Sequence, residues 1–305
     1  MKLSIQRETL LHPLQVVSSV VERRQTLPVL SNVLINCRNN KLTLTGTDLE
    51  VEMIAKVNLE QDVDEGETTL PARKILDICR ALPEEAMISL EMTGDKAIIR
   101  SGRSRFTLSC LPATDFPNIE PIDSPFEFSL SQSALKDLIE QTQFSMAHQD
   151  VRYYLNGLML EISNNTLKAV ATDVHRLAIS EVPTDIEISE TRQIIIPRKG
   201  VTELARLLED TERQVLIQIG QNHIKVDFPD ISFTSKLIDG KFPNYQQVIP
   251  ASPTRVLSCD RQALYQAFAR ASVLSNEKNR GMRLQLSNHL LKATVHNPEQ
   301  EEAEE

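Results

Sequence analysis

A seven-residue stretch, Leu42-Thr-Leu-Thr-Gly-Thr-Asp48, returns 125 residues later as Leu167-Lys-Ala-Val-Ala-Thr-Asp173. Two further markers return in the same order at an offset of 126 residues: Pro71 with Pro197, and the triplet Phe116-Pro-Asn with Phe242-Pro-Asn. Because chance repeats do not keep one order and nearly one offset, the chain contains a duplicated domain.

A third copy begins after the second. Leu291-Lys-Ala-Thr-Val-His-Asn297 aligns with residues 167–173 at an offset of 124, but the sequence ends at Glu305 without a counterpart of the Pro71 and Pro197 segments. We therefore expect copies over residues 1–125, 126–253 and 254–305. The third copy is expected to be C-terminally incomplete, by about 60–75 residues.

Apolar spacing predicts two helices in each copy. Pro13 is expected to kink the first helix or to delay its start, and Pro71 and Pro197 are expected at the first position of the second helix. The predicted stripes are Leu10, Leu14, Val17 and Val21 in the first helix, Ile75, Leu76, Cys79 and Leu82 in the second, and Val201, Leu204, Ala205 and Leu208 in its repeat. Alternating or β-branched runs lie between the helices, at residues 32–37, 41–47, 51–59, 97–100 and 106–111. The fold class is therefore α+β, with two helices per copy packed on antiparallel sheet.

Composition excludes several classes of protein. The chain has 305 residues, 41% hydrophobic and 25% charged, and a net charge of −9, as expected of a soluble globular protein. No apolar run reaches the roughly 18 residues of a membrane span, and the N-terminus lacks a secretory signal. The four cysteines form no CxxC motif, so we expect reduced thiols in a cytoplasmic protein, without a metal site. The nine glycines form no phosphate-binding loop, which disfavours nucleotide-dependent enzymes, and no cofactor is expected.

The distribution of charge matters more than its sum. The second helix of copy one carries Arg73, Lys74 and Arg80, and its repeat carries Arg198, Lys199 and Arg206, whereas acidic residues concentrate in the loops. One such helix is most simply an ordinary solvated face. Because the pattern recurs at equivalent positions, it favours a repetitive polyanion, and duplex DNA can be bound through its phosphates without sequence readout.

Several motifs resemble one known family. Gly46-Thr-Asp-Leu-Glu50, Pro71-Ala-Arg-Lys74 and Ser101-Gly-Arg-Ser-Arg-Phe106 are similar to the first domain of the bacterial sliding clamp, the β subunit of DNA polymerase III. The segments 144–157 and 171–177 are similar to its second domain, and 275–278 and 297–305 to its third, so the resemblance covers the whole chain. It implies tandem clamp domains in a head-to-tail dimeric ring, with helices lining a central hole and sheets forming the outer wall.

The resemblance also implies a function without catalysis. By this resemblance, the ring is expected to encircle duplex DNA, to slide along it and to confer processivity on the replicative polymerase. A clamp-loader ATPase is expected to open the ring, and the polymerase catalytic subunit, the loader and repair polymerases are expected to bind it through short peptide motifs. Two rival hypotheses are a non-encircling protein–protein scaffold and a hydrolytic or nuclease enzyme using Asp48, Asp173 and His175.

Site residues follow from positions that match the family. DNA contacts are expected at Arg24, Arg73, His148, Gln149, Tyr153, Tyr154, Arg198 and Lys199. Alternation along a strand would bury at least one of the two neighbouring tyrosines in a sheet, while the pair favours stacking against bases or sugars.

A hydrophobic peptide pocket is expected between domains two and three. Its residues are Leu155, Thr172, Val174, His175, Arg176, Leu177, Pro243 and Val248. Two departures from the family stand out: Val174 occupies a position that is usually glycine, and Gln246-Gln247 replaces a pair that is commonly basic.

Opposite charges are expected to meet across the dimer interface. The basic side comprises Lys74, Arg103 and Arg105, the apolar centre comprises Val273 and Leu274, and the acidic side comprises Glu299, Glu301, Glu302, Glu304 and Glu305. The alternative for the acidic run is a disordered charged tail.

Overall fold

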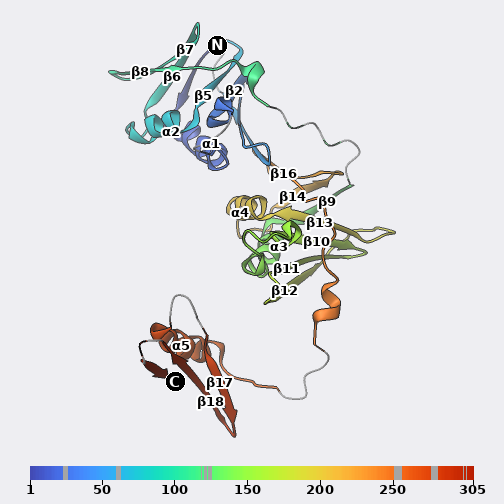
Figure 1. Cartoon of the computed structure of the whole chain (residues 1–305). Coiled ribbons are helices and arrows are strands. Elements are labelled where there is room, and N and C mark those ends of the chain that lie inside the picture. Colours follow the sequence, from blue (N-terminus) through green and yellow to red (C-terminus); the bar gives the residue numbers. More distant parts are fainter. Residues whose placement is uncertain are drawn as a thin grey trace. The chain divides into compact units, whose positions relative to one another are not determined.

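The computed structural model describes residues 1–22, 27–59, 63–117, 119, 122, 126–250, 256–275, 281–297, 299 and 301–305. The chain forms two compact units, Met1–Tyr245 and Gln246–Glu305, and each is considered by itself (Figure 1).

The first unit contains two copies of one succession of elements, strand, helix, four strands, helix and three strands. Copy one comprises β1 (Lys2–Gln6), α1 (Arg7–Ser19), β2 (Asn32–Arg38), β3 (Lys41–Thr47), β4 (Val51–Asn58), β5 (Gly66–Pro71), α2 (Ala72–Ala81), β6 (Met87–Thr93), β7 (Lys96–Ser101) and β8 (Ser104–Ser109). Copy two comprises β9 (Phe126–Ser131), α3 (Gln132–Glu140), β10 (Gly157–Ser163), β11 (Thr166–Thr172), β12 (Leu177–Pro183), β13 (Arg192–Pro197), α4 (Arg198–Leu207), β14 (Gln214–Ile219), β15 (His223–Asp227) and β16 (Ile231–Lys236). Short 3₁₀ turns span Pro28–Ser31, Ala113–Asp115, Gln143–Ser145, Tyr153–Leu155 and Tyr245–Val248. The predicted α+β class is confirmed.

Antiparallel sheets join the two copies. Copy one contributes a sheet of order β1-β6-β7-β8, and copy two contributes one of order β12-β11-β10-β13. The remaining strands of both copies form one eight-stranded sheet, β5-β2-β3-β4-β16-β15-β14-β9. The seam is the antiparallel pair of β4 with β16, in which Met53 lies opposite Phe233. Because backbone hydrogen bonds cross this seam, copies one and two share one continuous sheet.

The helices pack their apolar stripes on the sheets. Leu14, Val17 and Val20 of the first helical segment are completely buried, and a Cβ on Gly46 would lie 2.2 Å from the carbonyl oxygen of Val17. Only glycine therefore lets strand β3 approach α1 so closely. The side chains predicted for the second helices lie in the same core, with Ala205 at its edge.

Three local predictions for these helices were wrong. Helix α1 begins at Arg7 and continues through Pro13, so the late start does not occur, because the burial of its apolar face offsets the hydrogen bond that proline cannot donate. Val20 takes the buried place expected of Val21, which is only partly buried. Pro71 and Pro197 are N-caps at the ends of β5 and β13, one residue before the first helical position.

The second unit is smaller. It contains α5 (Arg261–Ala271), a 3₁₀ turn at Ser272–Leu274, and a three-stranded sheet of β17 (Arg283–Ser287), β18 (Leu290–His296) and β19 (Glu302–Glu304). Across the described ranges, the helices are too short or too polar to traverse a bilayer.

Candidate DNA, peptide and dimer interfaces

The repeated Thr-Asp stretch forms a turn after β3. Asp48 Oδ1 accepts hydrogen bonds from the N–H groups of Glu50 at 2.9 Å and Val51 at 2.7 Å, while Thr47 Oγ1 donates to the carbonyl of Val51. Leu49, in the middle of the turn, has φ 78°. The carboxylate thus replaces backbone partners and closes a tight reversal into β4.

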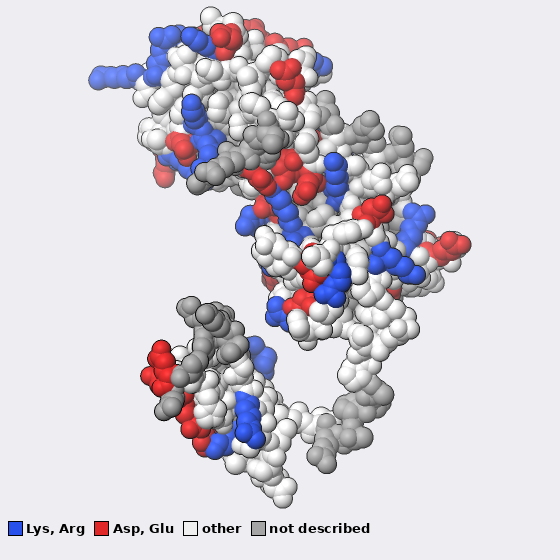
Figure 2. Space-filling view, in the orientation of Figure 1, with Lys and Arg blue, Asp and Glu red and all other residues white. Residues whose placement is uncertain are grey.

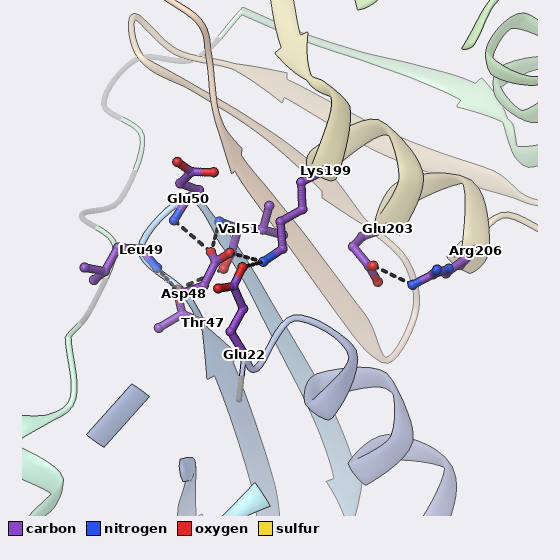
Figure 3. A network of polar contacts seen from close by, with 9 residues as sticks. All are labelled: Glu22, Thr47, Asp48, Leu49, Glu50, Val51, Lys199, Glu203 and Arg206. Atoms are coloured by element: carbon purple, nitrogen blue, oxygen red, sulfur yellow. Dashed lines mark hydrogen bonds and ion pairs between the residues drawn. The ribbon is translucent and has the colours of Figure 1, made fainter. Parts of the chain in front are cut away.

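The same turn holds the start of α4. Lys199 Nζ donates to Asp48 Oδ2 and to Glu22 Oε1, and Figure 3 shows Lys199 reaching from α4 toward both carboxylates. The side chain of Asp48 is only 4% exposed. Burial lowers the pKa of Lys199, but Asp48 and Glu22 raise it more, so its pKa lies above its ordinary value. These three residues, the Lys199 clasp, tie copy two to copy one beside the β4–β16 seam.

Copy two repeats the turn with the same bonds. Asp173 Oδ1 accepts from the N–H groups of His175 and Arg176, both at 3.0 Å, and Thr172 Oγ1 donates to the carbonyl of Arg176. Val174 takes the position of Leu49 with φ 68°. A β-branched residue is strained in this left-handed region, which glycine adopts freely.

This geometry weakens the case for an enzyme. Burial raises the pKa of Asp173, but the N–H groups of Arg176 and His175 and the Arg176 guanidinium outweigh it, so the pKa lies below its ordinary value. Asp48 is committed to the clasp. Both carboxylates are therefore occupied as structural acceptors, each in its own turn.

The third copy contains a related turn. Asn297 Oδ1 accepts from the N–H groups of Glu299 at 3.1 Å and Glu301 at 2.9 Å, and the N–H of Asn297 donates to the carbonyl of Glu301. The repeat predicted from the sequence is thus visible in local hydrogen bonding in all three copies.

Candidate DNA contacts fall into two groups. Arg73 is exposed on α2. Arg198 and Lys199 on α4 are half-buried, and Arg198 Nη1 donates to the carbonyls of Met146 at 3.0 Å and Ala147 at 3.4 Å. Arg24 lies outside the described residues.

The remaining DNA candidates lie on one loop, residues 147–156. His148, Gln149 and Tyr153 are exposed, Tyr154 is half-buried, and the tyrosine rings meet edge to face at 5.9 Å. The prediction that strand alternation buries one tyrosine was wrong, since both lie in a 3₁₀ turn. Tyr154 nevertheless packs against the cluster of Met159, Val170, Ile195, Phe242 and Tyr245.

Hydrogen bonds hold the loop at both ends and in its middle. The N–H of Ala147 donates to Leu155, and Asn156 donates its side-chain amide to the carbonyl of Asp150 at 2.8 Å. Arg152 donates to both oxygens of Asp150, and these bonds lower the pKa of Asp150 to about 2.

The peptide-pocket candidates of the first unit gather around the Asp173 turn. Leu177 packs on the same cluster as Tyr154, Leu155 is buried, and Pro243 is exposed. The guanidinium of Arg176 lies 5.6 Å from the centre of the Phe144 ring, which is 54% exposed and was not predicted from the sequence. Val248 belongs to the other unit, where it is 68% exposed.

The dimer-interface candidates lie on edge strands and exposed surfaces, except Leu274, which is half-buried in the Ser272–Leu274 turn. Lys74, Arg103 and Arg105 are exposed, the last on the edge strand β8, and Val273 is 77% exposed. The disordered-tail alternative was wrong for residues 302–304, which form β19. Two acidic side chains at this end are paired. Glu304 Oε1 lies 2.5 Å from Lys292 Nζ, and the Glu305 carboxylate accepts two hydrogen bonds from Arg270.

Charge and burial add features that composition did not predict. On the face drawn in Figure 2, basic and acidic side chains are interspersed over the first unit. Glu52 of β4 is only 6% exposed at the seam with copy two, and burial raises its pKa to about 7. A cavity of about 550 Å³ lies at the other end of the seam, lined by His12, Lys56, Arg213 and Phe228 among others.

Comparison with known proteins agrees with this architecture. Residues 1–120, 129–244 and 246–305 match the models of the N-terminal, central and C-terminal domains of the DNA polymerase III beta subunit. The beta sliding clamps of Pseudomonas putida and Escherichia coli are 55% and 52% identical over all 305 residues, which span 83% of each relative.

Solved structures give the same result. The sliding clamp of Pseudomonas aeruginosa bound to griselimycin matches with a TM-score of 0.96 at 54% identity, and the match covers 100% of this chain and 83% of that one. The clamp of Bartonella birtlesii matches with a TM-score of 0.94 at 38% identity and the same coverage. The chain belongs to the β sliding clamp family, the beta subunit of DNA polymerase III.

Proposed function

We propose that this chain is a DNA sliding clamp, which pairs head to tail into a ring around duplex DNA and tethers the replicative polymerase. The observation that carries the proposal is the repeated clamp domain, joined through the β4–β16 seam into a continuous sheet. A binder with 6–10 phosphate contacts loses roughly 10³–10⁵ in affinity between 50 and 200 mM salt. A closed ring separates retention on DNA from tight binding, so its charge contacts can remain weak and mobile.

Retention on circular DNA tests this proposal. Protein loaded on a nicked plasmid by a clamp-loader ATPase should stay bound through a high-salt wash and should leave when the plasmid is linearised. Equal retention on circular and linear DNA would contradict encirclement and would favour a non-encircling scaffold. The protein is expected to act in the cytoplasm, on chromosomal DNA.

DNA contacts are proposed on the helix starts and on the 147–156 loop. The exposed residues of these surfaces are the best candidates: Arg73, His148, Gln149 and Tyr153, with Arg24, Tyr154, Arg198 and Lys199 completing the set. Arginine can bind a phosphate through charge, while a tyrosine face can stack on a sugar or base. Such contacts read no sequence.

The internal seam suggests how two chains join. In the repeat, β8 corresponds to β16 and β19 corresponds to β4, and β8 and β19 are both edge strands. Applying the β4–β16 register to these edges places Ala303 opposite Phe106, and Glu304 of one subunit opposite Arg105 of the next. This pairing satisfies both strand edges and sets opposite charges side by side.

Partner proteins are proposed to bind near the Asp173 turn. Thr172, Val174, His175, Arg176 and Leu177, with Leu155, Pro243 and Val248, would form the pocket for short peptide motifs of polymerases and the clamp loader. Gln246 and Gln247 would add no charge to this pocket. The boundaries proposed for the three copies are residues 1–125, 126–253 and 254–305.

A further inference from the structure

The first residue of α4 holds both ends of the 147–156 loop. The guanidinium of Arg198 donates from Nη1 to the carbonyls of Met146 and Ala147, where the loop begins. The backbone N–H of the same residue donates to the carbonyl of Asn156, where the loop ends, at 2.9 Å. Loop entrance and exit therefore meet at one residue of a regular helix.

Copy one offers an internal comparison. Helices α2 and α4 both follow an N-cap proline, so Ala72 stands where Arg198 stands and Arg73 stands where Lys199 stands. Ala72 is buried and has no side chain that could reach a loop, whereas Arg73 is exposed. The two copies thus place a cation at the helix start in different ways, directed to solvent in copy one and to internal acceptors in copy two.

We propose that Arg198 is a positioning residue, which orients the loop carrying His148, Gln149 and Tyr153 instead of acting mainly as a phosphate ligand. The charge of Arg198 is directed at two carbonyl oxygens, and a planar guanidinium serves such acceptors with a geometry that an ammonium group lacks. The exposed middle of the loop, residues 148–153, contains Gln149 at φ 57°, so the loss of the Arg198 contacts should let this part relax even though Leu155 stays buried.

The inference rests on the proposal that this loop binds DNA. Two variants separate the charge of Arg198 from the geometry of its hydrogen bonds. Arg198→Lys keeps the charge but replaces the planar guanidinium with a freely rotating ammonium on a shorter side chain, while Arg198→Met removes both the charge and the donors. Arg73→Met removes an exposed cation at the neighbouring helix position of copy one and serves as the comparison for a lost phosphate contact.

Hydrogen exchange of the full chain without DNA tests the positioning role directly. Exchange at the N–H groups of Ala147, Asp150, Leu155 and Asn156 should rise about tenfold in both Arg198 variants and stay unchanged in Arg73→Met. Unchanged protection of the loop in both Arg198 variants would overturn the proposal.

DNA binding then tests what the loop does. Affinity for a fluorescent duplex, measured over a range of salt concentrations, should fall equally in Arg198→Lys and Arg198→Met. Arg73→Met should instead lower the salt slope by about 0.9, the value for one phosphate. Wild-type affinity in Arg198→Lys with weak binding in Arg198→Met would show a phosphate ligand and overturn the proposal. Faster exchange with unchanged DNA affinity in both Arg198 variants would overturn the proposal that the loop binds DNA. Clamp function itself would still be tested separately, by retention on circular DNA.

Discussion

Glu52 should make the junction between copies one and two sensitive to pH. It lies on β4 at the seam, opposite Thr234 of β16, which in turn lies opposite Lys225 of β15. Burial raises the pKa of Glu52 from 4.5 to about 7, while the N–H of Ile119 and the charge of Lys225, itself bonded to Asp227, act in the opposite direction. Because a pKa difference of one corresponds to 1.36 kcal/mol, protonation of the buried carboxyl stabilises the folded chain by about 3 kcal/mol relative to its ionised form.

The direction of the pH effect follows from the raised pKa. The folded chain holds the proton more tightly than the unfolded chain, so this contribution is complete below about pH 4.5 and is lost as the pH rises through about 7. Glu52→Gln keeps the shape of the side chain without titrating. The free energy of unfolding of the wild type, relative to this variant, should therefore fall by about 3 kcal/mol between pH 4.5 and pH 8.

Urea unfolding followed by circular dichroism at four pH values measures this difference. Glu50→Gln, at an exposed carboxylate of the neighbouring turn, is the matched control and should follow the wild type at every pH. A difference between wild type and Glu52→Gln that stays constant across the pH range would refute the reasoning, because it would mean that Glu52 does not change its charge state there.

Three further experiments test the turns and interfaces. Val174→Gly should raise the free energy of unfolding by about 1 kcal/mol, because φ 68° strains a β-branched residue. A thermal melt measures the change, and a lower melting temperature in the variant would contradict this reasoning. Lys199→Met should lower the free energy of unfolding by about 1–3 kcal/mol, because it leaves the buried Asp48 carboxylate without its cation. Glu22→Gln, at a half-exposed carboxylate, should lower it by less than about 1 kcal/mol. Equal losses in the two variants would argue against the clasp. Arg105→Glu should weaken the proposed dimer, as measured by sedimentation, and adding Glu304→Arg should restore it if the proposed register is right.

The succession of elements could be predicted from the sequence because it depends on local rules. The apolar stripes of α2 and α4 obey helical spacing. The repeated stretch that ends at Asp48, Asp173 and Asn297 appears in the three copies as the same turn or a related one. The seam between β4 and β16 could not be predicted, because strands that pair across copies carry no signal in their spacing. The tyrosine pair was misplaced for a related reason: Tyr153 and Tyr154 lie in a 3₁₀ turn, where alternation does not apply.

The clasp changes how the recurring positive charge should be interpreted. Recurrence at the starts of two helices suggested two equivalent DNA-facing patches. Arg73 and Lys74 of α2 are exposed, but Arg198 and Lys199 of α4 are half-buried, and Lys199 sits between two carboxylates. Lys199, Glu22 and Asp48 together carry a net charge of −1, so the two carboxylates offset the positive charge that Lys199 could present to a phosphate. The turn before β4 therefore has two structural roles in copy one. It reverses the chain into β4, and its Asp48 carboxylate accepts the hydrogen bond from Lys199 of copy two. The two copies thus keep the same backbone turn with different surroundings. The turn at Asp48 contacts Lys199 of the other copy, whereas Val174, in the turn at Asp173, is exposed.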